Sequence, residues 1–251
     1  MLIKKMEEEN RKIKKLNYYI LLCFSIFQII FLLFFGVMGM FSGYGKIFIH
    51  VTNWSFLMSS IYLISACICD TSVYFFSSKK LEKFNFFIRN KYSNIAFPFC
   101  FMITFGFWSI LLIGLLFGFD TFTKSSTKIT VRRALINLHL HFGITIMMVV
   151  ELLLNPKKEV KLGYSTIIAN TAIYLIYGII VLLARFQFNY SAYVFLDDLR
   201  FIWAFLIGVA IYGLLIGCVF FYKFLANKIN RKYFNSLKNE ETVVGNEENE
   251  K

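Results

Sequence analysis

The chain has few of the residues from which soluble enzymes commonly build active sites. Its 251 residues include only three histidines, five cysteines and two prolines. The sequence contains no GxSxG, HExxH or P-loop pattern, which argues against a serine-elbow hydrolase, a helical zinc site and a phosphate-binding loop. All five cysteines lie inside apolar segments, where neither a disulfide framework nor a zinc site is expected. We therefore expect no metal and no cofactor.

Charged residues are also scarce, and they are not spread as on a soluble protein. Only 17% of the residues are charged, whereas 58% are hydrophobic and 19% are aromatic. A composition this apolar indicates a protein that crosses a membrane several times. The net charge of +12 comes from short basic clusters between apolar segments, and such clusters orient membrane helices and contact anionic lipid. We expect no nucleic-acid partner.

Six apolar segments are long enough to cross a bilayer, which takes about 20 helical residues. They lie near 17–40, 46–78, 94–119, 131–154, 164–186 and 199–225. We predict an all-α, polytopic membrane protein with three parts, namely a basic arm at 1–16, a bundle of six transmembrane helices at 17–227 and a polar, disordered tail at 228–251. Lys and Arg concentrate in the arm, the second and fourth loops and the tail, which places both termini in the cytoplasm.

The second apolar segment begins with polar side chains. His50, Thr52, Asn53 and Trp54 open a run that is otherwise apolar and carries Asp70 near its end. Polar groups at the mouth of a spanning helix are costly unless they face protein or water, which makes them candidates for function. The alternative is that Thr52 bonds to its own helix while Trp54 anchors the helix at the membrane interface.

The fourth apolar segment carries polar residues at four-residue steps. Arg133, Asn137, His141 and Thr145 follow this spacing, which places them on one helix face that we expect to look into the bundle. Arg133 lies on the predicted outer side. Either the other basic clusters outweigh its charge in setting the topology, or Arg133 acts at the mouth of the bundle. For His141 two interpretations are open: a packed side chain with a satisfied hydrogen bond, or a catalytic imidazole oriented by Asn137.

His139 belongs to a different face of the same helix. It lies about 200° around the helix axis from His141, so the two histidines cannot serve one site. We predict that His139 forms a hydrogen bond to a neighbouring helix.

The predicted topology allows Thr52 and His141 to meet. Both helices run inward from the outer side at about 1.5 Å per residue, so both residues lie on the order of 10 to 13 Å deep. A hydroxyl within reach of an imidazole is the minimal arrangement of a nucleophile and its base. At that depth the substrate must be lipid-soluble. The competing hypothesis is a non-enzymatic carrier, or a lipid-binding or regulatory bundle, in which the two residues only hold helices together.

Four short motifs, in order, give the chain a family resemblance over about 52–193. They are Thr52 with Asp70, Ala96-Phe97-Pro98 with Trp108, Asn137 with His141 and Glu151, and Tyr193. In these motifs the chain resembles the androgen-induced and androgen-dependent TFPI-regulating family of membrane proteins, which hydrolyse fatty acid esters of hydroxy fatty acids. The sequence departs from the family pattern at Leu138, where histidine is common, and at Val194, where proline is common.

The resemblance implies roles for particular residues. Thr52 is the expected nucleophile and His141 the expected general base. Asp70 and Glu151 lie near the cytoplasmic ends of their helices, too far from Thr52 to complete a triad, and we predict that they form salt bridges with the basic loops.

The implied substrate adds three supporting residues to the predicted site. Arg133 would hold the free carboxylate of the lipid ester, and Asn137 and Asn53 are candidate oxyanion donors. The alternatives for the two asparagines are a helix-orienting amide and a surface residue. We expect a multi-pass protein of the endoplasmic reticulum or plasma membrane whose partners are the lipid ester and membrane lipids.

Overall fold

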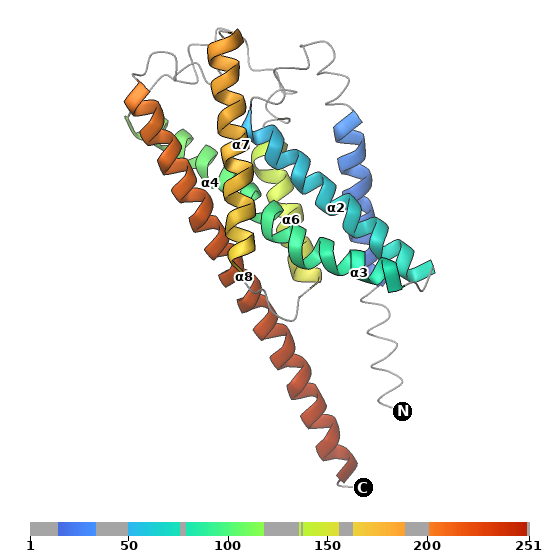
Figure 1. Ribbon diagram of the computed structural model, residues 1–251. Helices are drawn as coiled ribbons and strands as arrows, with labels where there is room; N and C mark the ends of the chain where they lie inside the picture. The colour runs from blue at the N-terminus through green and yellow to red at the C-terminus, as the bar shows by residue number, and fades with distance from the viewer. Residues whose placement is uncertain are drawn as a thin grey trace.

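The chain folds as a helical bundle (Figure 1). The computed structural model describes residues 15–33, 50–75, 79–117, 136, 138–155, 163–188 and 201–249. Within these ranges the secondary structure is helical and contains no β-strand, as the composition predicts.

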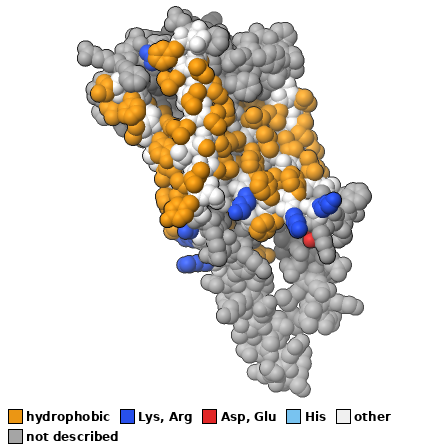
Figure 2. Space-filling model, in the orientation of Figure 1, with side chains coloured by type: hydrophobic (Ala, Val, Ile, Leu, Met, Phe, Trp, Pro, Cys, Tyr) orange, Lys and Arg blue, Asp and Glu red, His pale blue; other side chains and the backbone are white. Residues whose placement is uncertain are grey.

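In the part of the chain that the structure describes, four helices are long and apolar enough to cross a membrane. They are the N-terminal helix Lys15–Leu33, α2 (Val51–Phe75), α7 (Tyr164–Phe188) and α8 (Phe201–Asn249). Many apolar side chains of α7 face outward, where a membrane would cover them. They include Ile168, Leu175, Ile176, Ile179, Leu182 and Leu183. Figure 2 shows that hydrophobic side chains cover most of the described surface in that view. The protein is therefore an integral membrane protein.

The third and fourth predicted spans are also helical where the structure describes them. The third is α4 (Ser93–Phe117), and the fourth contains the short π-helix η3 (His139–Gly143) followed by α6 (Ile144–Leu154). Between α2 and α4 lie α3 (Lys79–Phe87) and a second π-helix, η2 (Ile88–Tyr92). The number of crossings and the cytoplasmic location of the termini stay predictions.

The last helix is longer than the sequence suggested. The polar composition of residues 228–251 predicted a disordered tail, but α8 continues to Asn249 and extends well beyond the rest of the bundle (Figure 1). This stretch has few apolar residues to pack, yet it contains no proline and only one glycine. Because its many Glu, Lys and Asn residues do not break a helix, a helix that has started upstream can elongate through them.

α4 is the central helix of the bundle, in contact with α2, α6, α7 and α8. Its aromatic residues form much of the core: Phe97 is fully buried and stacks on Tyr222 of α8, with ring centroids 4.7 Å apart. Burying large aromatic surfaces of this kind stabilises the packing of two helices beyond the area term alone.

A proline in the first turns of α4 creates a tie to α7. Pro98 has no backbone N–H, so the carbonyl oxygen of Asn94, four residues earlier, lacks its usual helical donor. The side-chain amide of Asn170 donates to that oxygen at 3.2 Å, and it also bonds to the carbonyl of Thr166 at 2.8 Å. A break in one helix is thus satisfied by a buried side chain of another.

Candidate active site

Thr52 lies in the first turn of α2. The turn is started by a hydrogen bond from the backbone N–H of Asn53 to the carbonyl oxygen of His50, 3.0 Å long. Thr52 and Asn53 are both half-buried. The first turn of a helix has unpaired N–H groups and a partial positive charge, which favours negative charge developing there.

His141 lies in the middle of η3, and its ring is held by α4. The imidazole stacks on Phe107, with centroids 3.8 Å apart and planes 13° from parallel. Its Nδ1 atom is buried and has no hydrogen-bond partner among the described residues. Buried polar atoms normally have a hydrogen-bond partner. An unpaired ring nitrogen inside a bundle is therefore able to accept a hydrogen bond from a ligand or a water molecule.

A chain of hydroxyl and thiol groups fixes the backbone at His141. Thr104 of α4 donates its hydroxyl hydrogen to the His141 carbonyl oxygen at 2.8 Å, and therefore accepts from the Thr145 hydroxyl at 2.6 Å. Thr145 in turn is 2.9 Å from the thiol of Cys100. A π-helix leaves its carbonyls in altered positions, and Thr104 supplies a partner for one of them.

His139 faces the opposite side, as predicted. Its Nε2 is 3.3 Å from the side-chain amide nitrogen of Gln28 on the N-terminal helix. Rings of Phe27, Phe31 and Phe56 surround it, with the nearest centroid at 4.4 Å. The predicted interhelical hydrogen bond of His139 is confirmed, and the two histidines point to different neighbours.

The predicted catalytic pair comes from two elements of the bundle, Thr52 from α2 and His141 from η3. The π-helix η3 contacts both α2 and α4, so the elements that carry Thr52 and His141 are neighbours. Among the hydrogen bonds of the described residues, none joins Thr52 to His141. Arg133 and Asn137 lie outside the described residues. The roles predicted for these four residues and for Asn53 stay predictions.

The two acidic residues of the motifs meet one arginine from the second basic loop. Arg89 of η2 forms salt bridges with Asp70 of α2, at 2.5 Å, and with Glu151 of α6. The hydroxyl of Tyr62 donates to the second oxygen of Glu151 at 2.7 Å. Burial by itself would lower the pKa of Arg89, but the negative charges of Glu151 and Asp70 raise it above its ordinary value. The predicted structural role of both carboxylates is confirmed.

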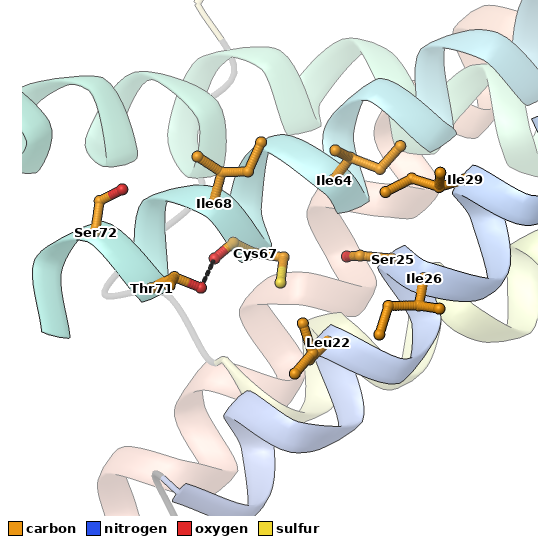
Figure 3. A pocket seen from close by; sticks show the side chains of 9 residues that line it. All are labelled: Leu22, Ser25, Ile26, Ile29, Ile64, Cys67, Ile68, Thr71 and Ser72. Carbon is orange, nitrogen blue, oxygen red and sulfur yellow. Dashed lines mark hydrogen bonds between the residues drawn. The ribbon is translucent and has the colours of Figure 1, made fainter. Parts of the chain in front are cut away.

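A separate apolar groove lies between the N-terminal helix and α2. Its volume is about 250 Å³. Figure 3 shows its lining, formed by Leu22, Ser25, Ile26, Ile29, Ile64, Cys67, Ile68, Thr71 and Ser72. The hydroxyls of Ser25 and Thr71 bond to backbone carbonyls, so the groove offers little to a polar ligand. It includes neither Thr52 nor His141.

The long apolar helices define the class of the protein, a helical integral membrane protein. The model of the FAR-17a/AIG1-like protein family matches residues 9–230. The chain therefore belongs to this family, the androgen-induced family that the motifs indicated. No curated protein and no solved structure matches the chain.

Proposed function

We propose that this protein is an integral membrane hydrolase that cleaves lipid esters, specifically fatty acid esters of hydroxy fatty acids, in the endoplasmic reticulum or plasma membrane. The observation that carries the proposal is the buried, unpaired Nδ1 of His141 on an element that packs against the helix of Thr52. Membership of the family is consistent with hydrolase activity.

In the proposed reaction Thr52 is the nucleophile and His141 the general base. With its mobile proton on Nε2, the imidazole has a free lone pair on Nδ1. His141 takes the hydroxyl proton as the Thr52 oxygen attacks the ester carbonyl carbon, and then gives it to the alkoxide of the departing hydroxy fatty acid. His141 next removes a proton from water as the water oxygen attacks the acyl carbon, and returns that proton to the Thr52 oxygen as the acyl–oxygen bond breaks and the fatty acid leaves.

Three further residues have proposed supporting roles. Arg133 pairs with the free carboxylate of the substrate, because a guanidinium matches a carboxylate with two parallel hydrogen bonds. Asn53 and Asn137 donate hydrogen bonds to the oxyanion of the tetrahedral intermediate. Asn53 is next to Thr52 in the first turn of α2, and the partial positive charge at the start of a helix favours the same negative charge.

A turnover assay tests the proposal. Purified full-length protein in detergent is given an ester of a fatty acid with a hydroxy fatty acid. We expect Thr52→Ala and His141→Ala each to lower kcat by roughly 100-fold or more, the usual contribution of a general base. Thr71→Ala and His139→Gln are matched controls that remove the same chemical groups from the other end of α2 and the other face of η3, and we expect near wild-type kcat for both.

A lipid-binding bundle without catalysis is a second candidate function. The observation that favours it is the apolar groove of Figure 3, which has the walls expected of a site for an acyl chain and lies apart from both proposed catalytic residues. If all five proteins of the assay, the wild type and its four variants, bind the ester equally and none hydrolyses it, this second function replaces the first.

A further inference from the structure

The short helix α3 has an unusual outer surface for a connecting segment. Phe84, Phe86 and Phe87 are 48%, 63% and 51% exposed. Lys80 and Lys83 are exposed on the same helix. Three large aromatic side chains within four residues would face solvent at this place if α3 stood in water, which soluble proteins seldom allow outside an interaction site.

The orientation of α3 is fixed by the buried ion cluster. The side-chain amide of Asn85 donates to Asp70 at 3.5 Å, and its oxygen accepts from Nε of Arg89 at 3.1 Å. Arg89 itself is held by carboxylates on two helices. These contacts direct polar groups of α3 and η2 inward, so that the aromatic rings and the lysines remain outside.

The positive charges near α3 lie at one end of the bundle. Figure 2 shows Lys and Arg side chains spaced along the lower edge of the hydrophobic surface, the end of the bundle at which α3 lies in Figure 1. From Lys80 to Lys91 the exposed charges are Lys80, Lys83 and Lys91 against Glu82. On α8, Lys228, Arg231 and Lys232 are exposed where the helix leaves its apolar part.

We propose that α3 lies in the membrane interface and binds the headgroups of anionic phospholipids. Aromatic rings that enter the acyl boundary next to lysines that reach the headgroups are the side chains of an interfacial helix. A cluster of basic residues directly beside a spanning helix attracts anionic lipid and gives no preference for a zwitterionic one. This surface is separate from the proposed hydrolase site and does not depend on it.

Lipid titration of the full-length protein tests this binding surface. Native mass spectrometry in detergent gives the dissociation constants of phosphatidylserine and of phosphatidylcholine with identical acyl chains. We expect the wild type to bind phosphatidylserine more tightly. Lys80→Gln with Lys83→Gln should weaken that binding about fivefold for each lysine, about 25-fold in all, and leave phosphatidylcholine unchanged.

Two control variants separate charge from structure. Lys80→Arg with Lys83→Arg keeps the charge and is expected to bind phosphatidylserine like the wild type. Arg185→Gln removes one positive charge from the last turn of α7 and is compared with the single variant Lys83→Gln. Lys83→Gln should weaken phosphatidylserine binding, whereas Arg185→Gln should leave it unchanged. The proposal is overturned if the wild type binds both lipids equally, or if the double Gln variant keeps its affinity for phosphatidylserine.

Discussion

Arg89 is the residue that links α2, η2 and α6 through buried charges. It holds Asp70 and Glu151, which are 19 and 62 residues away from it along the chain. The Glu151 side chain is fully buried and that of Asp70 is 25% exposed. Replacing such a buried network by apolar residues can be neutral, whereas removing one member leaves an uncompensated buried charge. The cluster therefore fixes how α2, η2 and α6 fit together.

The first prediction concerns Glu151. We expect Glu151→Gln to lower the free energy of unfolding by about 3 kcal/mol, because Arg89 keeps only one of its two carboxylate partners inside the bundle. Chemical unfolding in detergent, followed by tryptophan fluorescence, measures the change. Glu82→Gln on the exposed side of α3 is the matched control and should be within about 0.5 kcal/mol of wild type. If both variants lowered the free energy of unfolding equally, the stabilising role of Glu151 would be contradicted.

The second prediction concerns Thr104, a positioning residue for His141. Thr104→Val removes the donor to the His141 carbonyl, so the ring loses part of its support on α4. We expect a roughly tenfold lower kcat with little change in KM, since supporting residues around a site commonly contribute 10- to 100-fold. Thr104→Ser, which keeps the hydroxyl, should restore kcat. If Thr104→Ser is as impaired as Thr104→Val, the hydrogen bond is not the cause.

Several residue roles could be predicted from spacing, and others could not. The 200° separation of His139 from His141 predicts different neighbours, and the excess of basic residues near the helix ends predicts partners for Asp70 and Glu151. The link between Thr104 and His141 depends on two segments 37 residues apart meeting at one turn. Local patterns carry no information on that meeting, so the positioning residue was missed.

At the scale of elements, the π-helix η3 depends on one glycine. A Cβ atom placed on Gly143 would lie 2.6 Å from Nδ1 of His139, so this turn has no space for a side chain there. Nothing in the sequence from His139 to Gly143 signals a π-helix.

The third prediction compares two glycines. We expect Gly143→Ala to destabilise the protein by about 1–3 kcal/mol, because the added methyl group displaces His139. A Cβ atom added to Gly178, in the middle of α7, would meet nothing within 4 Å, so Gly178→Ala should stabilise by about 0.5–1 kcal/mol through helix propensity. Thermal unfolding of both variants checks the signs. A gain in stability for Gly143→Ala would contradict the close contact.

The fourth prediction tests the tie between α4 and α7. Asn170→Leu leaves the Asn94 carbonyl oxygen unpaired and should cost about 1–3 kcal/mol. In the background of Pro98→Ala the cost should be clearly smaller, because the new backbone N–H at position 98 can bond to that oxygen. A double-mutant cycle of unfolding free energies gives the coupling. Strictly additive effects would show that proline and asparagine do not compensate each other.

At the scale of the whole molecule, the apolar segments of the sequence predicted the helices. The basic loops predicted a partner for the carboxylates of Asp70 and Glu151, which is Arg89. The structure confirms a helical membrane protein with four helices of spanning length among the described residues. The length of α8 was not predicted, because apolar content marks where a helix enters the membrane and says nothing of how far a polar helix continues. The six crossings with cytoplasmic termini stay our proposal for the topology.

The central claim is that Thr52 is a nucleophile activated by His141. Its most direct test is labelling of the detergent-purified, folded protein with a fluorophosphonate probe, followed by peptide mapping by mass spectrometry. We predict that the probe attaches to Thr52 and that both Thr52→Ala and His141→Ala abolish the labelling, while Thr71→Ala and His139→Gln keep it. Labelling that persists in Thr52→Ala, or a folded wild type that takes up no probe, would contradict the claim.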